Sequence, residues 1–182
     1  MDRDGDASSR STVKSPITNN DDGVNNNDPQ TSSAAPALST NPTTAWSSPV
    51  LLFVYGSLMD TDIIQKVLHL ASPPAPLRAA TLKNYKMKMW SIYPTILPHT
   101  GSAVQGRVYP VERLEHFQRL ERYETKAYTW CECEVEYDDG DVARGCRVFV
   151  WAGDPESKDL HEGSFDLERY QTYYKPFLIG QP

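Results

Sequence analysis

The Tyr-Gly-Ser-Leu segment at residues 55–58 has the residue types and spacing of a ligand-binding turn. It ends an apolar run that begins at Val50 and precedes a stretch whose apolar residues recur at helical spacing. A tight turn between a strand and a helix directs unpaired backbone N–H groups toward one point, which favours an anionic ligand group. We predict that the segment contacts a ligand through Tyr55, Gly56, Ser57 and Leu58. The alternative is an ordinary tight turn that carries a helix cap.

Glu124 is the candidate for proton transfer. It lies in the segment Tyr123-Glu124-x-x-x-Tyr128, after an amphipathic helical pattern and before a hairpin pattern. A glutamate can take up and return a proton when its surroundings bring its pKa near neutrality. The alternative is an exposed glutamate at a helix end, because the chain holds 24 acidic residues. Tyr128 is expected to close the pocket or to bond the ligand, or else to begin a strand as an ordinary aromatic residue.

Periodicity predicts the elements that would position these residues. A short strand is expected over residues 50–55. It is followed by a helix that Asp60 or Thr61 caps and whose apolar residues continue to Ala71. The proline-rich residues 72–76 end this helix. One or two strands are expected over residues 79–90 and another over residues 103–109, followed by an amphipathic helix. Between these strands, Tyr93, Pro94 and Pro98 are expected to shape a loop over the site. A last helix is predicted over residues 165–174, capped by Ser164 and stopped by Lys175-Pro176.

A long hairpin is predicted over residues 128–137 and 143–151, with its turn at Asp138-Asp139-Gly140-Asp141. Folding there sets Cys133 opposite Cys146 and Glu132 opposite Arg147. The three cysteines then share one buried face, which favours packing over a redox or metal role. The Cys131-x-Cys133 spacing is also poor for zinc, and the four histidines show no ligand spacing. On the other face, Trp130, Phe149 and Trp151 are expected to pack under the C-terminal helix, or else to form an exposed patch for a partner.

Composition limits the classes of protein. Residues 1–48 are dominated by small and polar residues and are expected to form a disordered tail, with one folded domain over residues 49–182. The net charge of −6 argues against a nucleic-acid partner, which normally requires a basic patch. No apolar run is long enough to span a membrane, and no secretory signal is evident. A cytoplasmic location without a membrane or nucleic-acid partner is therefore expected, and no protein partner can be named.

In order and spacing, these motifs resemble the γ-glutamylcyclotransferase-like family, in its avirulence-induced-gene-like branch. They include Tyr55–Leu58, the segment at residues 93–98, the segment Val104-Gln105-Gly106-Arg107-Val108-Tyr109, and Glu124 with Tyr128. The resemblance implies an α+β fold, a small mixed β-barrel of about five to seven strands with helices packed outside. Antiparallel hairpins and interleaved helices in the predicted elements point to the same class, since strict βαβ alternation is missing.

The resemblance also implies a reaction. The α-amine of a γ-glutamyl group attacks its own γ-carbonyl, giving 5-oxoproline and a free amine. Glu124 matches the family's catalytic glutamate, in preference to Glu121, and would act as general acid and base. The N–H groups of Tyr55–Leu58 would hold the glutamyl end of the substrate. No metal or organic cofactor is needed, because both reacting groups belong to one molecule.

Two departures keep other functions open. Leu58 stands where glutathione-specific enzymes of the family commonly carry a polar residue, and Trp130 replaces an arginine that is often present. A γ-glutamyl amine or amide is therefore the expected substrate. The alternatives are a non-catalytic ligand-binding or stress-associated module of the family, and an enzyme that tailors an acyl group in metabolite biosynthesis.

Overall fold

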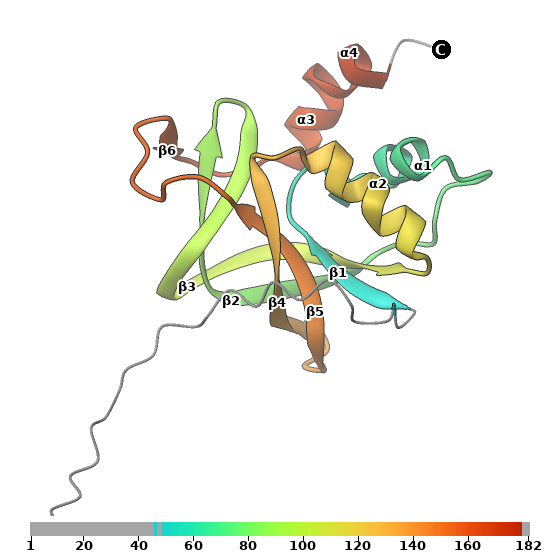
Figure 1. Cartoon of the computed structure of the whole chain (residues 1–182), viewed down its shortest axis with the longest axis horizontal. Helices are drawn as coiled ribbons and strands as arrows, with labels where there is room; N and C mark the ends of the chain where they lie inside the picture. The colour runs from blue at the N-terminus through green and yellow to red at the C-terminus, as the bar shows by residue number, and fades with distance from the viewer. Residues whose placement is uncertain (1–45, 47–48, 180–182) are drawn as a thin grey trace, which may run out of the picture. The chain divides into compact units, whose positions relative to one another are not determined.

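The structure is a computed structural model that describes Trp46 and residues 49–179, with side chains as far as Phe177. Apart from Trp46, the polar tail expected over residues 1–48 lies outside the described residues. In chain order the elements are β1 Val50–Val54, the 3-10 helix η1 Ser57–Met59, α1 Thr61–Leu68, β2 Arg78–Trp90, β3 Tyr93–Val111, α2 Leu114–Glu124, β4 Tyr128–Tyr137, β5 Val142–Trp151, β6 Leu160–Glu162, α3 Leu167–Tyr173 and α4 Lys175–Ile179 (Figure 1).

Five of the strands close into a mixed barrel. The strand order is β3-β1-β5-β4-β2, and pairing of β2 with β3 closes the ring. Only the β1–β5 pairing is parallel among the described strands, and β6 adds to β2 outside the ring. In Figure 1, α1 and α2 lie together on one side of the barrel, while α3 and α4 lie at one end of it. The expected small barrel with outer helices is confirmed.

Strand β1 separates two apolar cores. Phe53 faces the barrel interior, where residues from all five strands pack together. Leu52 and Val54 face the other way and pack against side chains of α1 and α2. Because side chains alternate between the faces of a strand, β1 must be apolar on both sides, which explains its uninterrupted apolar sequence.

The predicted hairpin register is confirmed at both of its stated pairs. Cys133 lies opposite Cys146, and Glu132 lies opposite Arg147. The three cysteines are free and contribute to the interior core, with Cys146 fully buried. Burial raises the pKa of the Cys146 thiol to about 11, so it stays protonated at neutral pH. The structure therefore shows these residues as packing residues.

The aromatic residues on the outer face of the hairpin pack, but not under the C-terminal helix as expected. Trp130 and Phe149 lie against Phe117 of α2, with ring centroids 5.8 Å away in both cases. Trp151 instead contacts Trp90 at 5.4 Å. The amphipathic helix that precedes the hairpin covers this face, because Phe117 and Leu120 form its buried side.

The loop expected over residues 93–98 is a strand, and this expectation was wrong. Tyr93 lies opposite Trp90, and pairing with β2 continues through Pro98. Pro94 and Pro98 are tolerated because β1 pairs only with the far end of β3, which leaves this part of β3 unpaired on its second side.

Two helix boundaries also differ from the prediction. The last long helix begins later than expected, since the Asp166 side chain, and not Ser164, accepts the capping hydrogen bond from the Arg169 N–H. Helix α1 ends at Leu68, because His69 takes a left-handed conformation with φ 56°.

Candidate active site

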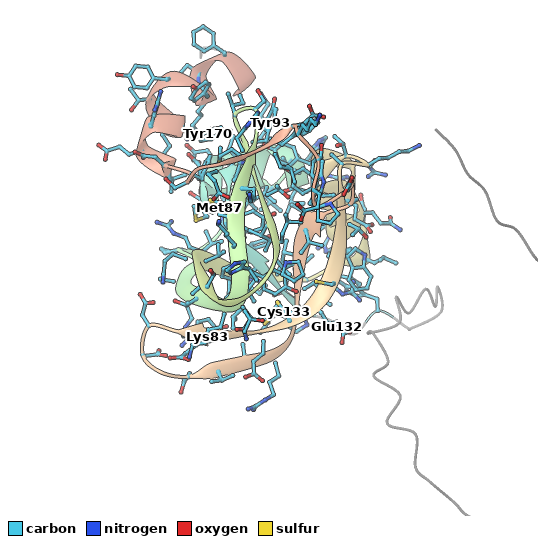
Figure 2. The ribbon with its side chains drawn as sticks, turned by 90° about the vertical axis from the view of Figure 1, so that its left-hand side faces the viewer. Lys83, Met87, Tyr93, Glu132, Cys133 and Tyr170 are labelled. Carbon is cyan, nitrogen blue, oxygen red and sulfur yellow. The ribbon has the colours of Figure 1, made fainter. Side chains whose placement is uncertain are left out.

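A cavity of about 360 Å³ lies where the end of β1, the β2–β3 turn, the end of α2 and the start of β4 meet. All six residues predicted to form a site line it: Tyr55, Gly56, Ser57, Leu58, Glu124 and Tyr128. Figure 2 shows Tyr93, another lining residue, at the same end of the molecule as Tyr170 of α3, whereas Lys83 and Cys133 lie near the other end. The barrel therefore carries its cavity at the end beside α3.

Glu124 is the last residue of α2, and the chain turns away immediately after it. Thr125 takes a positive φ of 66°, which ends the helix and leads into β4. The Glu124 side chain is partly buried, and among the described residues no hydrogen bond or ion pair to its carboxylate is found. Burial raises its pKa from the usual 4.5 to about 7. This carboxyl group can therefore take up and release a proton near neutral pH.

Three tyrosines surround the charge of Glu124. Burial raises the pKa of Tyr55, Tyr123 and Tyr128 first, and the nearby Glu124 carboxylate raises each pKa further. All three phenols therefore stay protonated. Tyr55 donates to the Phe149 carbonyl oxygen at 2.7 Å, and Tyr128 donates to the Pro94 carbonyl oxygen at 3.0 Å. These two hydroxyl groups hold the walls of the cavity together.

The segment at residues 55–58 packs closely against the start of β3. A Cβ atom at Gly56 would lie 2.8 Å from Cγ of Pro94, closer than side chains tolerate. The Ser57 hydroxyl and the Tyr123 hydroxyl are 2.9 Å apart, which ties the segment to the end of α2. Leu58 is buried and also packs in the core beneath the helices. Glycine at position 56 thus allows the contact that closes this side of the cavity.

A buried ion pair fastens the same segment to the C-terminal helices. Asp60 is 3% exposed and accepts from the Asp62 N–H, which caps α1. Lys175 Nζ lies 2.8 Å from Asp60 Oδ2, and Gln171 Nε2 donates to the same oxygen at 2.8 Å. Burial alone would raise the pKa of Asp60, but the hydrogen bonds from Lys175, Gln171 and the Asp62 N–H outweigh it and lower that pKa.

Sequence reasoning missed several lining residues. Trp90 and Phe149 come from strands that meet at the cavity only because the barrel closes. Tyr123 precedes Glu124 within the motif and could have been singled out by that position. Trp130, noted as a departure, is absent from the lining, and its Nε1 donates to Glu121 at 3.1 Å.

In Trp46 and residues 49–179, no three His, Cys, Asp or Glu side chains gather closely enough to hold a metal ion. Over the same residues, no helix has the length and apolar character needed to cross a membrane.

Comparison with known proteins identifies relatives of this chain. A family model described as "Gamma-glutamyl cyclotransferase, AIG2-like" matches residues 52–171. AIG2-like protein D of Arabidopsis thaliana is 27% identical over 129 residues, which cover 70% of this chain and 83% of that protein. AIG2-like protein C of the same organism is 26% identical over 128 residues, covering 70% and 73%. A solution structure of an Arabidopsis thaliana protein matches with a TM-score of 0.55 at 20% identity, over 75% of this chain and 81% of that one, which shows a shared fold.

Proposed function

The chain belongs to the AIG2-like gamma-glutamyl cyclotransferase family, and from this premise we propose that it converts a γ-glutamyl amine or amide to 5-oxoproline and the free amine. Family membership supports a cyclotransferase-type enzyme. The observation that carries the specific proposal is Glu124, which lines the cavity with the segment at residues 55–58. Its carboxyl group has no bonding partner among the described residues, and its pKa of about 7 suits proton transfer. The cytoplasmic location expected from the sequence stays a prediction.

The proposed reaction needs one proton carrier and no second reactant. Ionised Glu124 takes a proton from the α-ammonium group of the substrate, and the freed amine attacks the γ-carbonyl carbon. A new C–N bond closes the five-membered ring, and the bond from the γ-carbon to the departing nitrogen breaks. Glu124 gives its proton to that nitrogen, which leaves as the amine. Glu124 then takes the second proton that the ring nitrogen loses as it becomes an amide and passes it to the released amine, which departs as an ammonium ion and leaves Glu124 ionised. Atoms and charges balance without a metal or an organic cofactor, so we expect EDTA to leave the rate unchanged.

The surrounding residues have supporting roles in this proposal. The backbone N–H groups of Ser57 and Leu58 begin η1 and have no partner within that helix, so they are available to the glutamyl end of the substrate. Because the Tyr55 and Tyr128 hydroxyl groups already bond backbone carbonyls, we assign these two residues to shaping the cavity. Gly56 lets Pro94 pack closely against the segment, which closes this side of the cavity.

The test is a mass-spectrometric assay for 5-oxoproline with γ-glutamyl amides and amines. We expect product from the unaltered protein and at least a hundredfold lower kcat from Glu124→Gln, about the contribution of a general acid-base group. Glu121→Gln is the matched control, because Glu121 lies on the same helix, is absent from the cavity lining and should keep activity. The kcat/KM of the unaltered protein should rise with pH and level off above about 7. Full activity in Glu124→Gln would contradict the mechanism.

A further inference from the structure

One side of the cavity is a wall of aromatic rings formed by Trp90, Tyr93 and Tyr128, called here the aromatic wall. The ring centroids of Trp90 and Tyr93 are 6.0 Å apart. Trp151 supports the wall from behind, 5.4 Å from Trp90 and 6.3 Å from Tyr128. The rings brace one another, so their faces are held in place before any ligand binds.

The aromatic wall extends to the mouth of the cavity, away from the buried inner end. Tyr55 at the inner end is 6% exposed, whereas Tyr93 is 47% exposed. Figure 2 shows Tyr93 at the end of the barrel beside α3. If the glutamyl end lies at the segment of residues 55–58, the group attached to the departing nitrogen extends along Trp90 and Tyr93 toward solvent.

The cavity offers no positive side chain to such a group. Among the described residues that line it, Glu124 is the only ionisable side chain other than tyrosine, and none is Lys, Arg or His. The basic residues near it in the chain, Arg122 and Lys126, line a separate and more open depression. A carboxylate on the departing amine would lie near the Glu124 charge without a cation to balance it, which is unfavourable in a partly desolvated cavity.

From these observations, and resting on the proposed function, we propose that the preferred substrate is a γ-glutamyl amide whose departing amine carries an aromatic or similarly apolar group and no carboxylate. The ring of the amine packs on Trp90 and Tyr93, in the offset or edge-on geometries that aromatic pairs prefer. The aromatic wall thus sets specificity, while Glu124 and the segment at residues 55–58 act on the glutamyl part that all such substrates share.

Three substrates test the proposal. γ-Glutamyl-phenethylamide and γ-glutamyl-phenylalanine differ by one carboxylate, and γ-glutamyl-ethylamide lacks the ring. We expect kcat/KM to be highest for the phenethylamide, with the ethylamide about tenfold lower and γ-glutamyl-phenylalanine lower still. Equal or faster turnover of γ-glutamyl-phenylalanine would overturn the proposal. Calorimetric binding to Glu124→Gln, in which chemistry is blocked, should again give a higher affinity for the phenethylamide than for the ethylamide. In this variant γ-glutamyl-phenylalanine should be disfavoured less than in turnover, because the Glu124 charge is absent.

Turnover and binding together distinguish a failure of the proposed activity from a failure of the proposed substrate preference. If none of the three yields 5-oxoproline but the order of affinity holds, the cyclotransferase proposal fails and the preference of the cavity stands. If 5-oxoproline forms but the order is reversed, the preference fails and the cyclotransferase stands.

Variants of the aromatic wall locate the preference. Tyr93→Leu should reduce the ratio of kcat/KM for phenethylamide over ethylamide about fivefold. Tyr93→Arg adds a cation at the mouth and should shift the preference toward γ-glutamyl-phenylalanine, whose carboxylate it can pair. Tyr173→Leu is the control, because Tyr173 is exposed on α3 and is absent from the cavity lining. An unchanged substrate ratio in both Tyr93 variants would overturn the role of the wall.

Discussion

In Glu124, the proposed role in proton transfer conflicts with the stability of the folded protein. The partial burial that raises its pKa to about 7 also makes its ionised form unfavourable in the folded protein. A carboxylate at a helix end with no bonding partner among the described residues is a poor choice for stability alone. The proposed proton transfer gives a physical reason for its presence.

We predict that Glu124→Gln stabilises the protein at pH 8 by about 2 kcal/mol. A pKa of about 7 in the folded state and near 4.5 in the unfolded state means that the folded protein binds more protons between these values. Stability therefore falls as pH rises from about 4.5 to 7, because the carboxylate must ionise inside the cavity. The difference between the two pKa values corresponds to about 3 kcal/mol of stability. We expect the smaller value of about 2 kcal/mol, because solvent reaches part of the side chain and screens its charge.

The measurement is urea unfolding of both proteins at several pH values. The stabilising effect of Glu124→Gln should be largest above pH 7 and should disappear near pH 4, where Glu124 is protonated in both states. Glu121→Gln provides the control for a change on the same helix. An effect that does not vary with pH would show that Glu124 ionises as an exposed glutamate does.

At the scale of residues, much of the lining of the candidate site could be predicted from the sequence. The six predicted residues line one cavity because the motifs that carry them lie at strand ends and helix ends. The positions of Trp90 and Tyr93 in the structure could not be predicted in this way. Trp90 carries no local signal of a site. Tyr93 was expected to shape a loop over the site, and it lines the cavity from a strand instead, because β2 pairs with β3 up to this residue.

At the scale of elements, the Asp60–Lys175 ion pair connects the segment at residues 55–58 to α3 and α4. We predict that Lys175→Met lowers the free energy of unfolding by about 2 to 4 kcal/mol, because it leaves the buried Asp60 carboxylate without its cation. The η1 segment that follows Gly56 should also loosen, so KM should rise more than kcat falls. Equilibrium unfolding and steady-state kinetics measure the two effects.

The pH dependence gives this prediction a second check. The pKa of Asp60 in the folded protein lies below its usual 3.8, so the stabilisation is present above about pH 4 and is lost as pH falls through the folded-state value. The difference between the unaltered protein and Lys175→Met should therefore shrink in acid. Lys158→Met, at an exposed position, is the matched control and should change stability by less than about 0.5 kcal/mol. A loss equal to this control would refute a stabilising role of the pair.

The elements themselves differ in how well the sequence predicts them. For the β4–β5 hairpin, the residue pairs Cys133–Cys146 and Glu132–Arg147 could be predicted, because a turn motif lies between two runs of alternating residues. The first half of β3 could not, since two prolines argue against a strand unless its second side is unpaired. That condition is set by the length of β1, which pairs only with the far end of β3.

At the scale of the whole molecule, the site exists because the barrel closes. The residues that line it run from Phe53 to Phe149 and come from β1 and the segment after it, the β2–β3 turn, α2, β4 and β5. The barrel class could be predicted from hairpins and interleaved helices. The strand order could not, because it depends on the parallel contact of β1 with β5, for which no local motif exists.

Trp46 extends the folded unit beyond the predicted start at residue 49. Its ring centroid lies 5.6 Å from that of Phe117, and the Arg147 guanidinium lies 5.4 Å above it. Phe117 in turn packs on Phe149, one of the residues that line the cavity. Trp46 thus supports the same outer core that holds α2, the helix that ends at Glu124.

We predict that Trp46→Ala lowers the free energy of unfolding by about 1 to 2 kcal/mol, from lost ring packing and the lost cation–π contact. A chain shortened to residues 49–182 should lose a similar amount, whereas one shortened to residues 43–182 should keep the stability of the full chain. Trp46→Phe is the matched control, because it keeps an aromatic ring and removes an N–H that has no hydrogen-bond partner among the described residues. Urea unfolding of the four proteins measures the effect. Equal stability of the two shortened chains would place the start of the domain at residue 49 and make the Trp46 contact incidental.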